Sequence, residues 1–77
     1  MNRIPVKSSN VRSVGWAPGE QEGIGTLEVE FMGGQVYIYA DVPESEYQAL
    51  LGATSVGKHL NARIIGQYDE RFSHRSG

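Results

Sequence analysis

Alternating apolar and polar residues mark the middle of the chain as a β-hairpin. Apolar side chains occupy every second position in residues 26–32 and again in residues 35–40. This period of two is typical of half-buried strands. Gly33-Gly34 joins the two runs, and such a pair fits a tight hairpin turn because glycine accepts a positive φ. A shorter run, residues 10–16, predicts one more strand before the hairpin.

A two-residue turn centred on the glycine pair sets the predicted register of this hairpin. It places Glu28 opposite Tyr39 and Glu30 opposite Tyr37. Side chains that lie opposite one another share a face of the sheet. We therefore expect one face with the two tyrosines among the glutamates, and one apolar face. The apolar face would hold Leu27, Val29, Phe31, Val36 and Ile38.

Two helices are predicted after the hairpin. Asp41 and Glu44 have the spacing of an N-terminal capping box, and Gly52 is placed to end this helix in the left-handed conformation. The second helix should begin near Ser55 and end at Gly66, because apolar residues recur between them every four positions.

These elements predict an α+β domain. A lone hairpin is only marginally stable in water, so the apolar sheet face needs the helices to cover it. We expect a three-stranded antiparallel β-meander followed by two α-helices packed on one face, in the order β-β-β-α-α. Residues 1–72 would form this single domain, and residues 73–77 would be a frayed C-terminal tail.

Charge is segregated along the chain, although the formal net charge is only −2. Residues 1–12 carry bases without acids, residues 13–57 carry acids without bases, and residues 58–77 carry an excess of bases. One interpretation is an ordinary solvated surface. The other is that the two basic ends meet and form one positive face, suited to phosphate or to an acidic protein.

Composition excludes several classes of site. The chain has no cysteine, and His59 and His74 have no further ligands at metal-binding spacing, so we expect no metal and no cofactor. Neither histidine accompanies a nucleophile and an acid at a recognisable spacing, so an enzyme is not predicted. No membrane-spanning run and no apolar leader occur, so the expectation is a cytoplasmic monomer without membrane contact.

An ordered set of short motifs resembles the KTSC domain family over about residues 4–66. The motifs are Ser8-Ser9-Asn10, Tyr37-Ile38-Tyr39, Val42-Pro43 and Ser55-x-Gly57-Lys58. Members of that family occur as short bacterial and phage-type proteins and at the C-terminus of some lysyl-tRNA synthetases. The resemblance implies a small binding domain, and the synthetase fusions suggest RNA as a ligand.

Tyrosines and bases are the candidate binding residues. They are Arg3, Lys7, Arg12, Tyr37, Tyr39, Lys58 and Arg63. The tyrosines would stack on bases of RNA or pack across strands, and the neighbouring glutamates favour packing, because carboxylates repel phosphate. The bases would contact an anion or lie on solvated faces; Arg12 would alternatively pair with Glu28 or Glu30.

The sequence thus predicts a non-catalytic binding module that docks on a protein partner. A concrete version is a phage-type regulator of the host transcription machinery, which binds RNA polymerase through an N-terminal arm of residues 3–7. The alternative is an RNA- or tRNA-binding domain.

Overall fold

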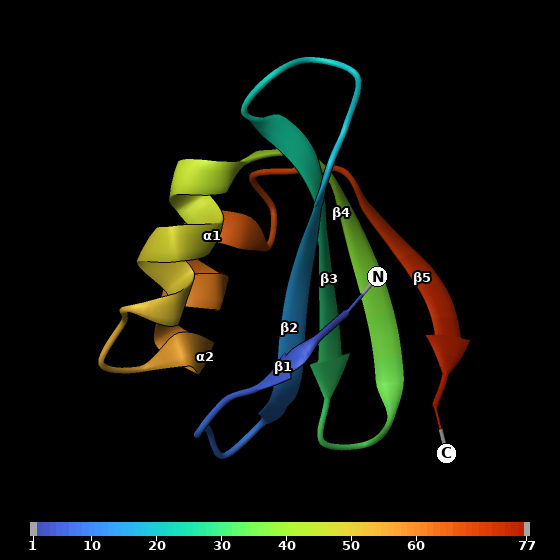
Figure 1. Ribbon diagram of the computed structural model, residues 1–77. Helices are drawn as coiled ribbons and strands as arrows, with labels where there is room; N and C mark the ends of the chain where they lie inside the picture. Colours follow the sequence, from blue (N-terminus) through green and yellow to red (C-terminus); the bar gives the residue numbers. More distant parts are fainter. Residues whose placement is uncertain (1, 77) are drawn as a thin grey trace.

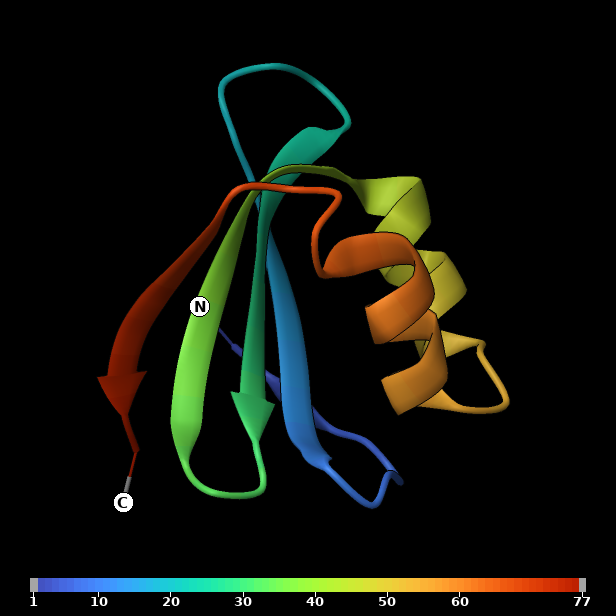
Figure 2. The same cartoon turned by 180° about the vertical axis from the view of Figure 1, so that it is seen from behind.

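A five-stranded antiparallel sheet carries the helices on one of its faces (Figures 1 and 2). The structure is a computed structural model and describes residues 2–76 of the 77-residue chain. In chain order the elements are β1 Ile4–Pro5, β2 Val11–Pro18, β3 Ile24–Phe31, β4 Gln35–Pro43, α1 Glu44–Leu51, α2 Val56–His59, the π-helical turn η1 Leu60–Ile64 and β5 Glu70–Arg75. The α+β class is confirmed, but the sheet has five strands where the sequence predicts three.

Both additional strands come from the ends of the chain. The sheet order is β1-β2-β3-β4-β5, so β5 returns after the helices to pair with β4 (Figure 1). Residues 73–75, predicted to fray, belong to β5, and Ser76 is bonded to the sheet through its N–H and the carbonyl of Gly34. Residue 77, the last of the predicted tail, lies outside the described residues.

The turn between β3 and β4 corrects the predicted register by one residue. Gly34 N–H donates to the Phe31 carbonyl at 2.8 Å, so Met32 and Gly33 are the central residues of the turn. Gly34 follows with φ 91°. A turn followed by one left-handed residue gives a three-residue hairpin loop, not the two-residue loop that we expect from the glycine pair.

The corrected register reverses the predicted direction of the tyrosines. Val29 lies opposite Tyr37 and Leu27 opposite Tyr39, so both phenol rings share the helix-facing side with the aliphatic residues of β3. Glu30 instead lies opposite Val36 on the other side, which we call the outer face. The expectation that the tyrosines point outward among glutamates is therefore wrong.

The core lies between the sheet and the helix layer. Its buried members are Val11, Val14, Leu27, Val29, Tyr39, Val42, Leu50, Val56, Leu60 and Ile64. The predicted start of the first helix is wrong, because Asp41 and Pro43 still belong to β4 and Asp41 has φ 57°. Gly52 does end the helix, but with φ −90°. Ser55 caps the second helix as expected, and its Oγ accepts from Lys58 N–H at 3.2 Å.

The two turn glycines allow a test of the register. Gly34→Ala should lower the free energy of unfolding by about 1–2 kcal/mol, because an alanine is strained at positive φ. Gly33→Ala, the matched control, should cost much less, because Gly33 does not have a positive φ and the nearest atoms belong to the flexible Gln35 side chain. Urea unfolding measures both variants. A loss for Gly33→Ala as large as that for Gly34→Ala, or larger, would indicate a two-residue turn, because a type I′ turn needs a positive φ at both positions and a type II′ turn needs it at the first.

Candidate functional site

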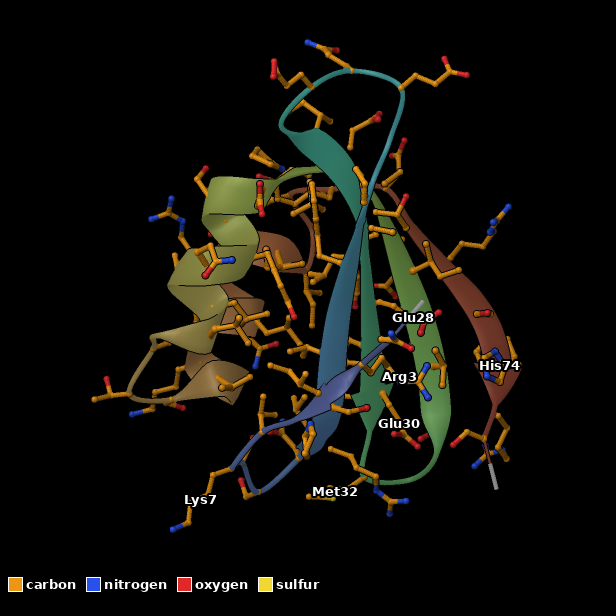
Figure 3. All side chains as sticks on the ribbon, viewed as in Figure 1. Arg3, Lys7, Glu28, Glu30, Met32 and His74 are labelled. Atoms are coloured by element: carbon orange, nitrogen blue, oxygen red, sulfur yellow. The ribbon has the colours of Figure 1, made fainter. Side chains whose placement is uncertain are left out.

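The acidic residues of β3 are buried in an ion-pair network on the outer face. Glu28 and Glu30 are only 9% and 7% exposed. The Arg3 guanidinium contacts the Glu28 carboxylate directly, and its Nη2 lies 3.8 Å from Glu30 Oε1 (Figure 3). Ser13 Oγ accepts from Arg3 Nε at 3.0 Å and donates to Glu30 Oε1 at 2.9 Å. Buried carboxylates need such partners, so this network is structural.

Both ends of the described chain converge on Glu30. Ser76 Oγ donates to one of its oxygens, Ser13 to the other, and Arg3 and Arg12 lie nearby. The hydrogen bonds from Ser76 and Ser13, with a smaller contribution from the two arginines, lower the pKa of Glu30 below its usual 4.5. The ends therefore meet, as one interpretation of the charge pattern expects, but they meet on carboxylates.

The N-terminal arm is packed onto the sheet. Ile4 of β1 pairs with Val14 of β2. The residues just before Ile4 cross the outer face towards β4 (Figure 1). It runs so close to Gly15 that a β-carbon there would lie 2.6 Å from the carbonyl oxygen of Asn2. The predicted docking arm of residues 3–7 is thus part of the fold, and Lys7, at its end, points away from the sheet (Figure 3).

Of the predicted basic residues, the structure brings Arg3 and Arg12 together at Glu30 and places the others apart. Arg12 is exposed on β2, where its Nη2 donates to the Met32 carbonyl at 3.2 Å. Arg63 lies in η1 with its Nη2 3.5 Å from Glu46 Oε2, and His59 Nε2 lies 3.0 Å from the other oxygen. Lys58 is exposed on α2. The bases thus occupy separate elements, and Arg3, Arg12 and Arg63 each contact a carboxylate.

An aromatic groove opens on the helix-facing side of β4. Its volume is about 360 Å³, and its walls are Phe31, Gln35, Tyr37, Tyr39, Ile65 and Glu70. The Tyr37 ring stands edge-on between Phe31 and Phe72, with centroid separations of 5.8 and 5.5 Å. Such pairs stabilise the sheet beyond simple burial. The groove is therefore a preformed apolar surface between the end of η1 and β5.

The two predicted tyrosines have different roles in this groove. Tyr39 is 1% exposed, and burial together with the nearby Glu70 carboxylate raises its pKa well above the usual value for tyrosine. Tyr37 is half-buried and remains accessible from the groove. Tyr39 is thus mainly a core residue, whereas Tyr37 is placed to contact a ligand.

Four of the residues that line the groove are not among the predicted binding residues: Phe31, Gln35, Ile65 and Glu70. Phe72, which packs against Tyr37 beside the groove, is not predicted either. Phe72 is 52% exposed on β5, where every residue of the strand is exposed, so no alternating pattern marks it. The one available signal is an aromatic residue in an otherwise polar segment.

The motif segments near the start and the end of the predicted domain touch each other. Ser8 Oγ accepts from the N–H groups of Asn10 and Val11 and holds the loop after β1. A β-carbon on Gly57, in α2, would lie 2.7 Å from Asn10 Oδ1. The serine–asparagine motif and the Ser-x-Gly-Lys motif thus form one corner of the fold, where glycine permits the close approach.

The comparisons agree with this geometry. A family model, the KTSC domain, matches residues 7–68. The chain belongs to the KTSC domain family. This KTSC domain is 46% identical over 61 residues to an uncharacterized protein of Stutzerimonas stutzeri, covering 79% of this chain and 80% of the relative. It is 32% identical to the crystal structure of a KTSC domain protein from Yersinia pestis, with a TM-score of 0.85 and coverage of 95% and 97%.

Among the described residues, this KTSC domain has neither a cluster of metal-binding side chains nor a helix that could span a membrane. Within residues 2–76, no three histidine, aspartate or glutamate side chains gather closely enough to hold a metal ion. None of the helices in that part of the chain has the length and apolar character needed to span a bilayer.

The ion-pair network predicts how stability depends on pH. Because the pKa of Glu30 is lowered in the folded state, its carboxylate stabilises the domain above pH 4.5, and this contribution is lost as the pH falls further. Glu30→Gln should therefore be less stable than the wild type at pH 7, and the difference should shrink in acid. Glu20→Gln, at an exposed loop position, is the matched control. Thermal unfolding between pH 3 and pH 7 measures the gap; a gap that stays constant would contradict the role of Glu30.

Proposed function

We propose that this KTSC domain is a non-catalytic module that docks on a protein partner through the aromatic groove. The groove accepts an aliphatic or aromatic side chain from a segment of that partner. Tyr37 and Ile65 both line the groove, and the Phe72 ring on β5 packs edge-on against Tyr37. Exposed aromatic residues of this kind are typical anchors of protein interfaces.

The charge of the groove supports a protein ligand. Glu70 is the one charged residue among those that line it, and its carboxylate repels phosphate. The bases predicted to bind an anion lie elsewhere, and three of them contact carboxylates. An apolar side chain gains from the aromatic walls and meets no such repulsion.

The contacts of the two histidines support a binding role and not a catalytic one, because each histidine is bonded to another side chain outside the groove. His59 is held by Glu46 at the helix layer and does not line the groove. His74 Nδ1 contacts the hydroxyl of its neighbour Ser73 at 2.9 Å on the exposed strand β5. The concrete partner in this proposal is the one predicted from the sequence, RNA polymerase, a large assembly on which a small domain can dock.

Affinity for the partner tests the proposal. The domain is used to capture proteins from a nuclease-treated bacterial lysate, with purified RNA polymerase as a direct arm, and the dissociation constant of the captured protein is then measured. Ile65→Gln should weaken binding about tenfold, because it removes apolar contact in the groove. Ile4→Gln is the matched control, since Ile4 is 45% exposed on β1 at the opposite end of the sheet.

Unchanged affinity of the Ile65→Gln variant would contradict the groove as the docking site. Absence of any stoichiometric protein after nuclease treatment would contradict the protein partner itself. Circular dichroism confirms that both variants are folded, and Gln35→Lys, with Gln21→Lys as its control, provides a second probe of the groove at a position outside the core.

RNA is the second candidate ligand, and one observation favours it. The corrected register moves Tyr37 to the helix-facing side, so it no longer lies beside Glu28 and Glu30, which are on the outer face. Binding to RNA should then weaken steeply with salt, and Lys58→Glu should weaken it further. Titration with tRNA by fluorescence anisotropy measures both effects. Absence of binding at low salt would exclude this candidate.

A further inference from the structure

We infer that the free edge of β5 pairs with β5 of a second copy of this chain and joins two sheets into one. This inference rests on the backbone edge and the charges of β5 and not on the groove function, although Glu70 also lines the groove. Its basis is the self-complementary sequence of a strand whose outer edge is free of partners throughout residues 2–76.

The edge of β5 is accessible over its whole length. It is the last strand in the sheet order, and all six of its residues are exposed (Figure 2). By contrast, the opposite edge of the sheet is the two-residue strand β1. An exposed edge strand presents unpaired N–H and C=O groups that pair readily with another strand.

A bulge in β5 determines which residues share a face. Tyr39 lies opposite Glu70, Tyr37 opposite Phe72 and Gln35 opposite Arg75, whereas Ser73 is skipped. Glu70, Phe72 and Arg75 are therefore on the helix-facing side. Their partners on β4 settle this, because opposite residues share a face.

Two copies of β5 can pair antiparallel in a register that keeps the helix-facing residues of both copies on one side of the joined sheet. In this register the charges of the two strands are complementary. It places Glu70 of each copy opposite Arg75 of the other, and Arg71 opposite His74 on the outer face. The Glu70–Arg75 pair occurs twice because the arrangement has two-fold symmetry. Within each copy, Arg75 Nη1 donates to the Gly33 carbonyl of the same chain. The other N–H groups of the guanidinium are left for a carboxylate of the second copy.

The same pairing covers the most exposed apolar side chain of the sheet. Phe72 is 52% exposed and lies next to the two-fold axis, opposite Ser73 of the second copy. The two phenylalanine rings then become diagonal neighbours across the new strand pair, within reach of one another. Because the paired edge is short, the interface is small and the dimer is weak. The fraction of dimer therefore rises with protein concentration.

Charge reversal gives a direct test. Sedimentation equilibrium at concentrations up to about 1 mM should show a monomer–dimer equilibrium for the wild type. Glu70→Arg and Arg75→Glu, each alone, turn both attractive pairs into repulsive ones and should weaken dimerisation about tenfold. An equimolar mixture of the two variants restores opposite charges at both pairs and should dimerise like the wild type. The double variant Glu70→Arg/Arg75→Glu should also dimerise.

Two controls carry the same charge changes at exposed positions away from β5. Lys7→Glu and Glu20→Arg should dimerise as the wild type does. A wild type that stays monomeric over the whole concentration range would overturn the inference. So would a mixture of Glu70→Arg and Arg75→Glu that fails to recover, because then the charges do not meet across the interface.

Discussion

The position of β4 against β3 is the constraint on which this fold depends. The left-handed residue Gly34 closes a three-residue loop, and that choice decides which side chains of β4 face the helices. The tyrosines go to the helix side, and Val36 goes to the outer face beside Glu30. Val36 is nevertheless completely buried. The outer face of a sheet with helices on one side only must therefore be covered by something else.

The chain ends provide this cover, and they explain the charge pattern. A basic arm and a C-terminal strand fold onto an acidic central strand, so Arg3 and Ser76 both reach Glu30. Burial of carboxylates is unfavourable unless they are paired and hydrogen-bonded, and the segregated sequence supplies the partners. Arg3, Arg12 and Arg63 are thus paired with acids within the domain, so these three bases do not contribute to one free positive face.

The sequence contains the elements of the fold more clearly than their arrangement. Period-two alternation identifies β3, whose apolar side chains face the helices and whose glutamates face the chain ends, even though both faces are buried. The aliphatic and aromatic residues of β4 alternate in the same way. The glycine pair fits both a two-residue and a three-residue turn, so it cannot set the register by itself. Strand β5 has no buried face and hence no pattern, although Phe72 marks it. Asp41 has the composition of a helix cap but takes a positive φ at the end of β4, where tertiary contacts override local preference.

The incomplete helix layer then explains where a ligand can bind. Helix α1 packs on β2, β3 and β4, and η1 ends at Ile64, before the chain turns at Gly66 with φ 84° and returns as β5. No helix among the described residues lies over the boundary between β4 and β5. The aromatic residues at this boundary therefore stay uncovered beside the groove, and the edge of β5 stays free. A single exposed phenylalanine is common in proteins. Phe72, however, continues a row of rings into a preformed groove, and contiguous apolar surface of this kind is what a partner covers.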